Sequence, residues 1–123
     1  MSEERPASVV VVVLNDLIFE TKIRSTAQAL GIETVVTRTV DSLLAALQRR
    51  PTSLLLVDLN TSGVEAVAAG HAHIPRPRII AYVSHVDQEL AAQAKAAGAD
   101  QVMPRSRFTT ELPRILQSHG APF

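Results

Sequence analysis

Several polar side chains of this sequence come directly after apolar segments, and their types are those that bind cations or anions. They provide one amide, two carboxylates, a hydroxyl, an imidazole and a guanidinium, in the order Asn15, Asp16, Asp58, Ser84, His85 and Arg105. Carboxylate and amide oxygens bind divalent cations, whereas guanidinium groups bind anionic oxygens. These residues can act together only if the fold brings them to one place.

The apolar segments before these residues are typical of buried strands. Residues 8–14 hold five successive valines, and 53–58 and 79–83 are similar runs without polar alternation. Continuous apolar strands of this kind are buried on both faces, as in a parallel sheet between two layers of helices. Shorter strands are predicted over 33–38 and 101–103.

Helical patterns alternate with these strands. Apolar spacing, capping residues and terminal glycines predict helices over 17–30, 39–49, 64–70, 87–97 and 107–117. Thr39 or Asp41 is expected to cap the second helix, and Pro113 is expected near the start of the last. The alternation predicts an α/β fold with an open parallel sheet. Because the carboxyl ends of parallel strands share one edge, the polar residues are expected to lie there.

The composition indicates one well-buried domain. The chain has 123 residues, of which 46% are hydrophobic and 20% charged, with 12 basic and 12 acidic side chains. We expect a flexible N-terminus over 1–7, a single domain over 8–119 and a C-terminal tail over 120–123. The net charge of zero and the 3% aromatic content argue against direct binding to nucleic acid.

Other classes are excluded by what the sequence lacks. It has no cysteine, so disulfides and thiolate metal sites are excluded. The acidic N-terminus is unlike a signal peptide, and the apolar run 9–14 is far shorter than the roughly 20 residues that cross a bilayer. We therefore expect a cytoplasmic protein without membrane contact. No glycine-rich phosphate loop follows the first strand, which argues against a nucleotide-binding enzyme.

Over nearly its whole length the sequence resembles the receiver domain of bacterial response regulators. The resemblance rests on the strand that ends at Asp58 (Leu-Leu-Leu-Val-Asp-Leu-Asn), on Ser84, on Ala97-Gly-Ala-Asp100 and on Arg105. It implies the flavodoxin-like (CheY-like) fold, a doubly wound five-stranded parallel sheet of order 2-1-3-4-5 with helices on both faces.

The resemblance also implies a role for each of these side chains. Asp58 matches the aspartate that the family phosphorylates, Ser84 matches its Ser/Thr, and Arg105 stands where the family has a lysine. An aspartyl phosphate carries much negative charge, so its formation needs a divalent cation held by further carboxylates. The family's paired acids for this cation fall on Leu14 and Asn15.

These departures from the family pattern predict a degenerate receiver. Leucine cannot bind Mg²⁺ and an amide binds it weakly, so Asn15, Asp16 and Asp58 would form a weak Mg²⁺ site or none. Arg105 presents a wide planar fork in place of a compact ammonium. Val102 stands where the family often has an aromatic residue.

The leading hypothesis is a stand-alone receiver-like signalling module that acts by protein–protein interaction, with phosphorylation lost or atypical. Its expected partners are a histidine kinase, a downstream effector or a second copy of the chain, bound through 87–97, 101–103 and 107–117. The alternative is an active phosphoacceptor of a two-component phosphorelay, phosphorylated on Asp58 with Mg²⁺. Neither hypothesis makes it an enzyme beyond self-phosphorylation and dephosphorylation. A third is a flavodoxin-like binder of a chromophore or nucleotide.

Simpler structural roles remain open for the same residues. Asp58 has two possible structural roles: it can form an ion pair with Arg105, or it can cap the turn that follows it. Asp16 lies just before a predicted helix, where a carboxylate caps free N–H groups and meets the helix dipole favourably. Ser84 can form a hydrogen bond with its own loop instead of a phosphoryl oxygen.

The histidines and the remaining arginines have alternatives as well. His71 and His73 are two residues apart, which suits either a metal-binding pair or two exposed loop side chains. His85 is interpreted as an exposed loop residue rather than a pH switch. A basic patch on one rim is a further hypothesis, formed by Arg76, Arg78, Arg105 and Arg107.

Overall fold

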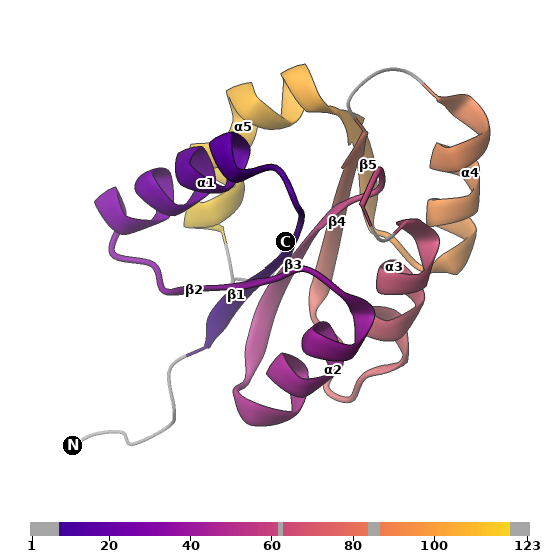
Figure 1. Ribbon diagram of the computed structural model, residues 1–123, viewed down its shortest axis with the longest axis horizontal. Coiled ribbons are helices and arrows are strands. Elements are labelled where there is room, and N and C mark those ends of the chain that lie inside the picture. The colour runs from indigo at the N-terminus through magenta and orange to yellow at the C-terminus, as the bar shows by residue number, and fades with distance from the viewer. Residues whose placement is uncertain (1–7, 62, 84–86, 119–123) are drawn as a thin grey trace.

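The computed structural model describes residues 8–61, 63–83 and 87–118, in which strands and helices alternate from the first to the last (Figure 1). In chain order the elements are β1 (Val9–Val13), α1 (Leu17–Ala29), β2 (Thr34–Thr37), α2 (Val40–Arg49), β3 (Thr52–Asp58), α3 (Gly63–Ala72), β4 (Arg78–Val83), α4 (Gln88–Ala97), β5 (Gln101–Pro104) and α5 (Arg105–Gln117). The proposed boundaries of the flexible N-terminus and the C-terminal tail fall at residues outside this description and stay predictions.

The sheet has the predicted topology. Its five strands lie in the order β2-β1-β3-β4-β5, and every neighbouring pair is parallel. The register places Val13 beside Thr37 on one side and Val57 on the other, and it places Asp58 beside Tyr82. The ends of β1, β3 and β4 therefore lie at one edge of the sheet, as expected from the sequence.

Helices cover both faces of the sheet, which explains why β1 has no polar alternation. Alternate valines of β1 belong to two different cores: Val9, Val11 and Val13 pack with residues of α2, α3 and α4. Val10 and Val12 pack with residues of α1 and α5 on the opposite face. All five valines are inaccessible to solvent. None of the helices in the described ranges has the length and apolar character needed to cross a membrane.

Capping residues set the helix starts much as the sequence predicts. Asp16 and Asp87 cap α1 and α4, and Thr39, rather than Asp41, caps α2 in a reciprocal pair of hydrogen bonds with Ser42. Two of these three caps are carboxylates, which also meet the positive end of the helix dipole.

The last helix differs from the prediction. It begins at Arg105, two residues earlier than expected, and Pro113 lies well inside it rather than near its start. The N-cap is Pro104, whose φ of −65° leads into the helix. Pro113 has no N–H for the carbonyl of Thr109, so one helical hydrogen bond is missing. Burial of four apolar side chains of α5 offsets this loss: Phe108, Leu112, Ile115 and Leu116.

Candidate functional site

Asp58 ends β3 at the carboxyl edge of the sheet and is nearly buried, with 8% of its surface exposed. Its carboxylate accepts a hydrogen bond from the Asn60 N–H at 2.9 Å and one from the Thr61 hydroxyl at 3.3 Å. The N–H of Thr61 also donates to the main-chain carbonyl of Asp58. Asp58 therefore caps the turn that follows β3, which is one of the two structural alternatives. Within the described ranges it forms no ion pair.

The second carboxylate at this edge, Asp16, has two partners. One carboxylate oxygen accepts a hydrogen bond from the Phe19 N–H at 3.0 Å and so caps α1. The other oxygen accepts a hydrogen bond from the Arg105 guanidinium at 2.6 Å. The Phe19 hydrogen bond and, next, Arg105 hold the pKa of Asp16 below its ordinary value. Asp16 is thus an ionised cap that is already paired with a cation.

Arg105 is the partner of Asp16 and not of Asp58, so the proposed Asp58–Arg105 ion pair is wrong. Arg105 is the first residue of α5 and directly follows β5. Its hydrogen bond with Asp16 brings it to the start of α1. Its guanidinium carbon lies 4.2 Å from the centre of the Phe19 ring. A planar guanidinium can stack on a ring and form a hydrogen bond at the same time, which an ammonium does less well. The arginine at this position is therefore suited to the contacts it has.

An aromatic cluster lies beneath both carboxylates. Tyr82 stacks on Phe108 with 4.4 Å between ring centres and meets Phe19 edge-on at 5.3 Å. The Tyr82 hydroxyl is buried and has no hydrogen-bond partner among the described residues. Burial raises the pKa of Tyr82 far above its ordinary value, and the negative charge of Asp58 raises it further, while Arg105 opposes both. The Tyr82 phenol therefore stays neutral.

The donor set at this edge does not fit a strong Mg²⁺ site. Leu14 is fully buried in the core beneath α1 and α5, and Asn15 is exposed. Asp16 is bound to Arg105, and Asp58 to the turn after β3. In the described ranges, no three histidine or acidic side chains converge as metal ligands. Mg²⁺ strongly prefers several hard oxygen ligands in octahedral geometry, which these residues do not assemble. The weak Mg²⁺ site proposed at Asn15, Asp16 and Asp58 stays a prediction.

Two of the candidate residues, Ser84 and His85, lie outside the described residues. His71 lies in the last turn of α3, where its Nδ1 accepts a hydrogen bond from Nε of Arg76 at 3.0 Å. His73 follows the same helix and is half-buried. The histidine pair therefore has at least one ring nitrogen engaged with an arginine, and metal binding by it stays untested.

The hypothesis of one basic patch is wrong. Arg76 precedes β4 and Arg105 follows β5, so in a parallel sheet the two lie at opposite edges. Arg76 pairs with Asp100, which lies just before β5. Arg107 pairs with Glu111 of its own helix. Arg78 and Arg107 line one hollow, but Arg76 and Arg105 lie at opposite ends of the strands, so the four arginines form no single patch.

No protein-family model matches the sequence, and no curated protein matches it either. Solved structures do match. A response regulator from Thermotoga maritima is 14% identical and has a TM-score of 0.76, with 94% of this chain and 100% of that chain covered. The signal receiver domain of an HD domain-containing protein from Pseudomonas fluorescens Pf-5 is 17% identical with a TM-score of 0.80, covering 91% and 93%. The chain has the fold of a response-regulator receiver domain.

A third solved structure has the same fold. It is a response regulator protein from Burkholderia pseudomallei whose structure has a phosphorylated aspartic acid, a calcium ion and citrate. It is 19% identical with a TM-score of 0.73, and the match covers 91% of this chain and 72% of that chain. Likenesses at these identities concern the fold.

Two residues of the site, Phe19 and Thr61, are not among those predicted from the sequence. Both follow a carboxylate by three residues, Asp16 in one case and Asp58 in the other. The third residue after a capping carboxylate offers the N–H or hydroxyl that satisfies it. That spacing predicts the hydrogen bonds of these residues with the carboxylates. It does not predict that the Phe19 ring lies against the Arg105 guanidinium.

Proposed function

We propose that this chain is a receiver-like signalling module of the cytoplasm that acts by binding other proteins, with phosphorylation of Asp58 lost or atypical. One observation carries the proposal: the cation that the receiver site needs for a phosphoryl group, Arg105, is bound to Asp16. The proposal includes no enzymatic activity on other molecules and no direct contact with nucleic acid.

The argument concerns charge. A phosphoryl group on Asp58 would bring negative charge to an edge where Asp16 is also ionised. Magnesium ligands and a free cation normally neutralise such charge. Here Arg105 would have to leave both Asp16 and the Phe19 ring to reach the phosphoryl oxygens. The resting arrangement therefore stabilises an unmodified Asp58.

The expected contact surface is formed by α4, β5 and α5. A hollow of about 100 Å³ lies between α4 and β5, with Val83, Ala91, Val102 and Met103 in its lining. Its mainly apolar lining suits a side chain from a protein partner better than a charged ligand. We propose a histidine kinase or a downstream effector protein as the partner there, or a second copy of this chain.

The alternative function is an active phosphoacceptor. It is favoured by the place of Asp58, at the end of the central strand β3 in the fold of a response regulator that contains a phosphorylated aspartic acid. In this alternative Asp58 is phosphorylated with Mg²⁺, and Arg105 exchanges Asp16 for the phosphoryl group.

The test is incubation of the whole chain with acetyl phosphate and MgCl₂, read by intact mass and peptide mapping under conditions that preserve acyl phosphates. We expect no phosphoryl adduct on Asp58. Asp58→Asn is the matched control, because it keeps the shape of the side chain and removes the nucleophile. An adduct on wild type that disappears in Asp58→Asn overturns the phosphorylation-independent proposal and supports the alternative.

A further inference from the structure

The two edge strands of the sheet differ in how well they are protected from pairing with another chain. The edge strand β5 contains Pro104, which removes a main-chain donor, as in many protected edges. The other edge strand, β2, has the sequence Thr-Val-Val-Thr, with neither proline nor charge. β-Branched residues of this kind favour strand pairing. The β2 edge is thus the one suited to take up a further strand.

The main chain of β2 has donors and acceptors available on its outer side. Val10 donates its N–H to the carbonyl of Glu33, and Leu14 donates to the carbonyl of Thr37. Residues 33, 35 and 37 therefore face β1 in the parallel ladder. The N–H and C=O groups of Thr34 and Val36 then point away from the sheet. They form a short template for hydrogen bonds with an extended peptide.

A hollow lies on each side of this edge. On the side of α2 a hollow of about 630 Å³ is lined by Val35, Ala45 and Ala46, together with polar and arginine side chains. On the side of α1 a hollow of about 450 Å³ is lined by Arg24, Gln28, Thr34 and others. Figure 1 shows β2 passing between α1 and α2. Alternate side chains of an added strand would enter these two hollows in turn, because strand side chains alternate between the faces.

The charges along this edge favour an acidic partner. Glu20 is the only ion-pair partner in the described ranges for both Arg24 and Arg38, so one carboxylate faces two guanidiniums. Arg50 is balanced by Glu33, whereas Arg49 has no ion pair in the same ranges. These groups sum to an excess of two positive charges.

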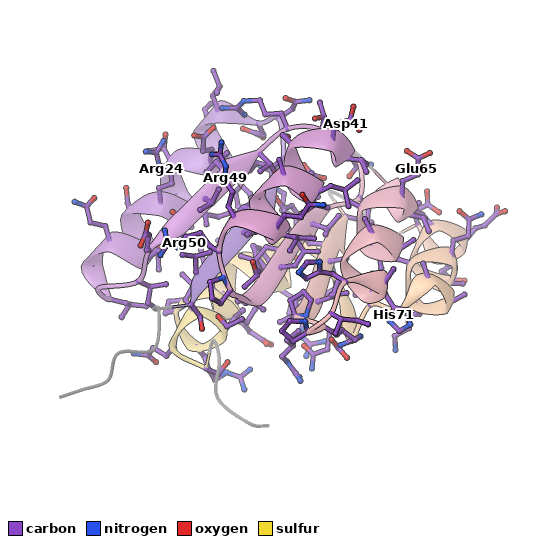
Figure 2. The ribbon with its side chains drawn as sticks, turned by 90° about the horizontal axis from the view of Figure 1, so that it is seen from below. Arg24, Asp41, Arg49, Arg50, Glu65 and His71 are labelled. Carbon is purple, nitrogen blue, oxygen red and sulfur yellow. The ribbon has the colours of Figure 1, made fainter. Side chains whose placement is uncertain are left out.

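The arrangement of these arginines is visible in Figure 2. In this view Arg24 of α1 lies on the same side of the molecule as Arg49 and Arg50 at the end of α2, and Asp41 lies at the far end of α2. Negative charge on a partner strand would meet this side of the edge. A second copy of the chain would bring the same positive charge and repel it.

We propose that β2 binds an extended acidic segment of a partner protein as a sixth strand of the sheet. Apolar side chains of that segment would enter the hollow beside Val35 and Ala46, and its acidic side chains would enter the hollow that Arg24 lines on the other face. Arg49, in the lining of the first hollow, would add long-range attraction to the same negative charge. This surface is separate from the one formed by α4, β5 and α5. It does not depend on the state of Asp58, so the phosphodonor experiment leaves it untouched.

The probe is a fluorescein-labelled peptide, Val-Glu-Val-Glu-Val-Glu-Val, titrated with the full chain and read by fluorescence anisotropy. We expect saturable binding in the micromolar to millimolar range. Thr34→Pro removes one outward N–H and leaves the ladder to β1 intact, so it should weaken binding roughly fivefold.

Charge variants provide the matched comparison. Arg49→Glu should weaken binding by roughly threefold to tenfold, and more at low salt than at high salt. Lys95→Glu makes the same change of charge on exposed α4 and should leave the affinity unchanged. Circular dichroism verifies that each variant is folded, and if Thr34→Pro fails to fold, Arg49→Glu carries the test.

Three results would overturn the proposal. The first is no binding of the peptide at millimolar protein. The second is equal weakening by Arg49→Glu and Lys95→Glu, which indicates attraction to net charge alone. The third is a dimer in analytical ultracentrifugation that Thr34→Pro abolishes, because it would show that a second copy occupies this edge.

Discussion

Two arginine–aspartate pairs lie at opposite ends of the parallel strands, Arg76–Asp100 at the amino ends and Arg105–Asp16 at the carboxyl ends. They differ in the number and kind of their hydrogen bonds. At the amino edge, Arg76 binds both carboxylate oxygens of Asp100 at 3.2 Å each. The same guanidinium donates to the carbonyl of Gly98 at 2.6 Å and to His71. Asp100 also accepts the N–H of Ile79 at 2.8 Å. This pair connects the segments that precede β4 and β5.

At the carboxyl edge, Arg105 has one hydrogen bond with Asp16 and the face of Phe19 beneath it. Bidentate pairs with further main-chain partners are geometrically fixed, whereas a pair with one hydrogen bond at a partly exposed position adds less to the stability of the fold. The difference indicates that Arg76–Asp100 maintains the fold and that Arg105–Asp16 sets the state of the site. The predictions below test this difference, beginning with the largest effect.

The largest effect is expected at Gly98. Its φ is 120°, and a Cβ there would meet the ring of His71. Gly98→Ala should reduce the free energy of unfolding by about 2 to 4 kcal/mol, from backbone strain and this contact together. Gly31→Ala is the control: its φ is also positive, at 74°, but nothing lies within 4 Å of its Cβ. Chemical denaturation measures both, and equal losses would show that the contact with His71, next to the Arg76–Asp100 pair, adds no rigidity.

The next effect compares the two arginines directly. Arg76→Ala removes the bidentate pair and leaves Asp100 half-buried without its cation, so the free energy of unfolding should fall by about 1 to 2 kcal/mol. Arg105→Ala should reduce it by less than half as much, because Asp16 keeps the Phe19 N–H. Urea denaturation of both variants makes the comparison. A larger loss for Arg105→Ala would contradict this account, because it would show that Arg105–Asp16 is the pair that stabilises the fold.

A smaller effect concerns titration. Burial raises the pKa of Asp100, but the Ile79 N–H and Arg76 outweigh it, and both Asp100 and Asp16 titrate below their ordinary value of 3.8. A lowered pKa in the folded state adds stability that is complete above the unfolded pKa and is lost as pH falls through the folded one. Unfolding should therefore become easier below about pH 4.

The arginine variants separate the two carboxylates. NMR titration should show the Asp16 pKa rising only part of the way to its ordinary value in Arg105→Ala, since the Phe19 hydrogen bond is the larger cause. No change in that pKa would mean that Arg105 does not face Asp16 in solution.

Much of the fold was predictable from local signals. The valine run of β1, the capping carboxylates Asp16 and Asp87, and the strand that ends at Asp58 each follow from neighbouring residues, and the structure has them as expected. The last helix was predicted from residue 107, whereas α5 begins two residues earlier, and Pro113 lies inside it instead of near its start. The burial of apolar side chains of α5 against distant parts of the chain offsets the hydrogen bond that Pro113 cannot donate.

The pairing within the site was not predictable in the same way. Arg105 and Asp16 are 89 residues apart, and two carboxylates at the same sheet edge were available to the guanidinium. The choice depends on where α5 begins relative to α1, and on the Phe19 ring beneath the guanidinium. Sequence spacing contains neither quantity.

The central claim is that Arg105, rather than a metal ion, neutralises Asp16 at the carboxyl edge of the sheet. A titration with MgCl₂, followed by ¹H–¹⁵N NMR at the amides of Phe19, Asn60 and Thr61, tests it most directly. We predict no saturable shift of these amides in wild type at millimolar Mg²⁺, and the appearance of a weak response in Arg105→Ala. Saturable shifts at all three amides of wild type below 1 mM Mg²⁺ would contradict the account.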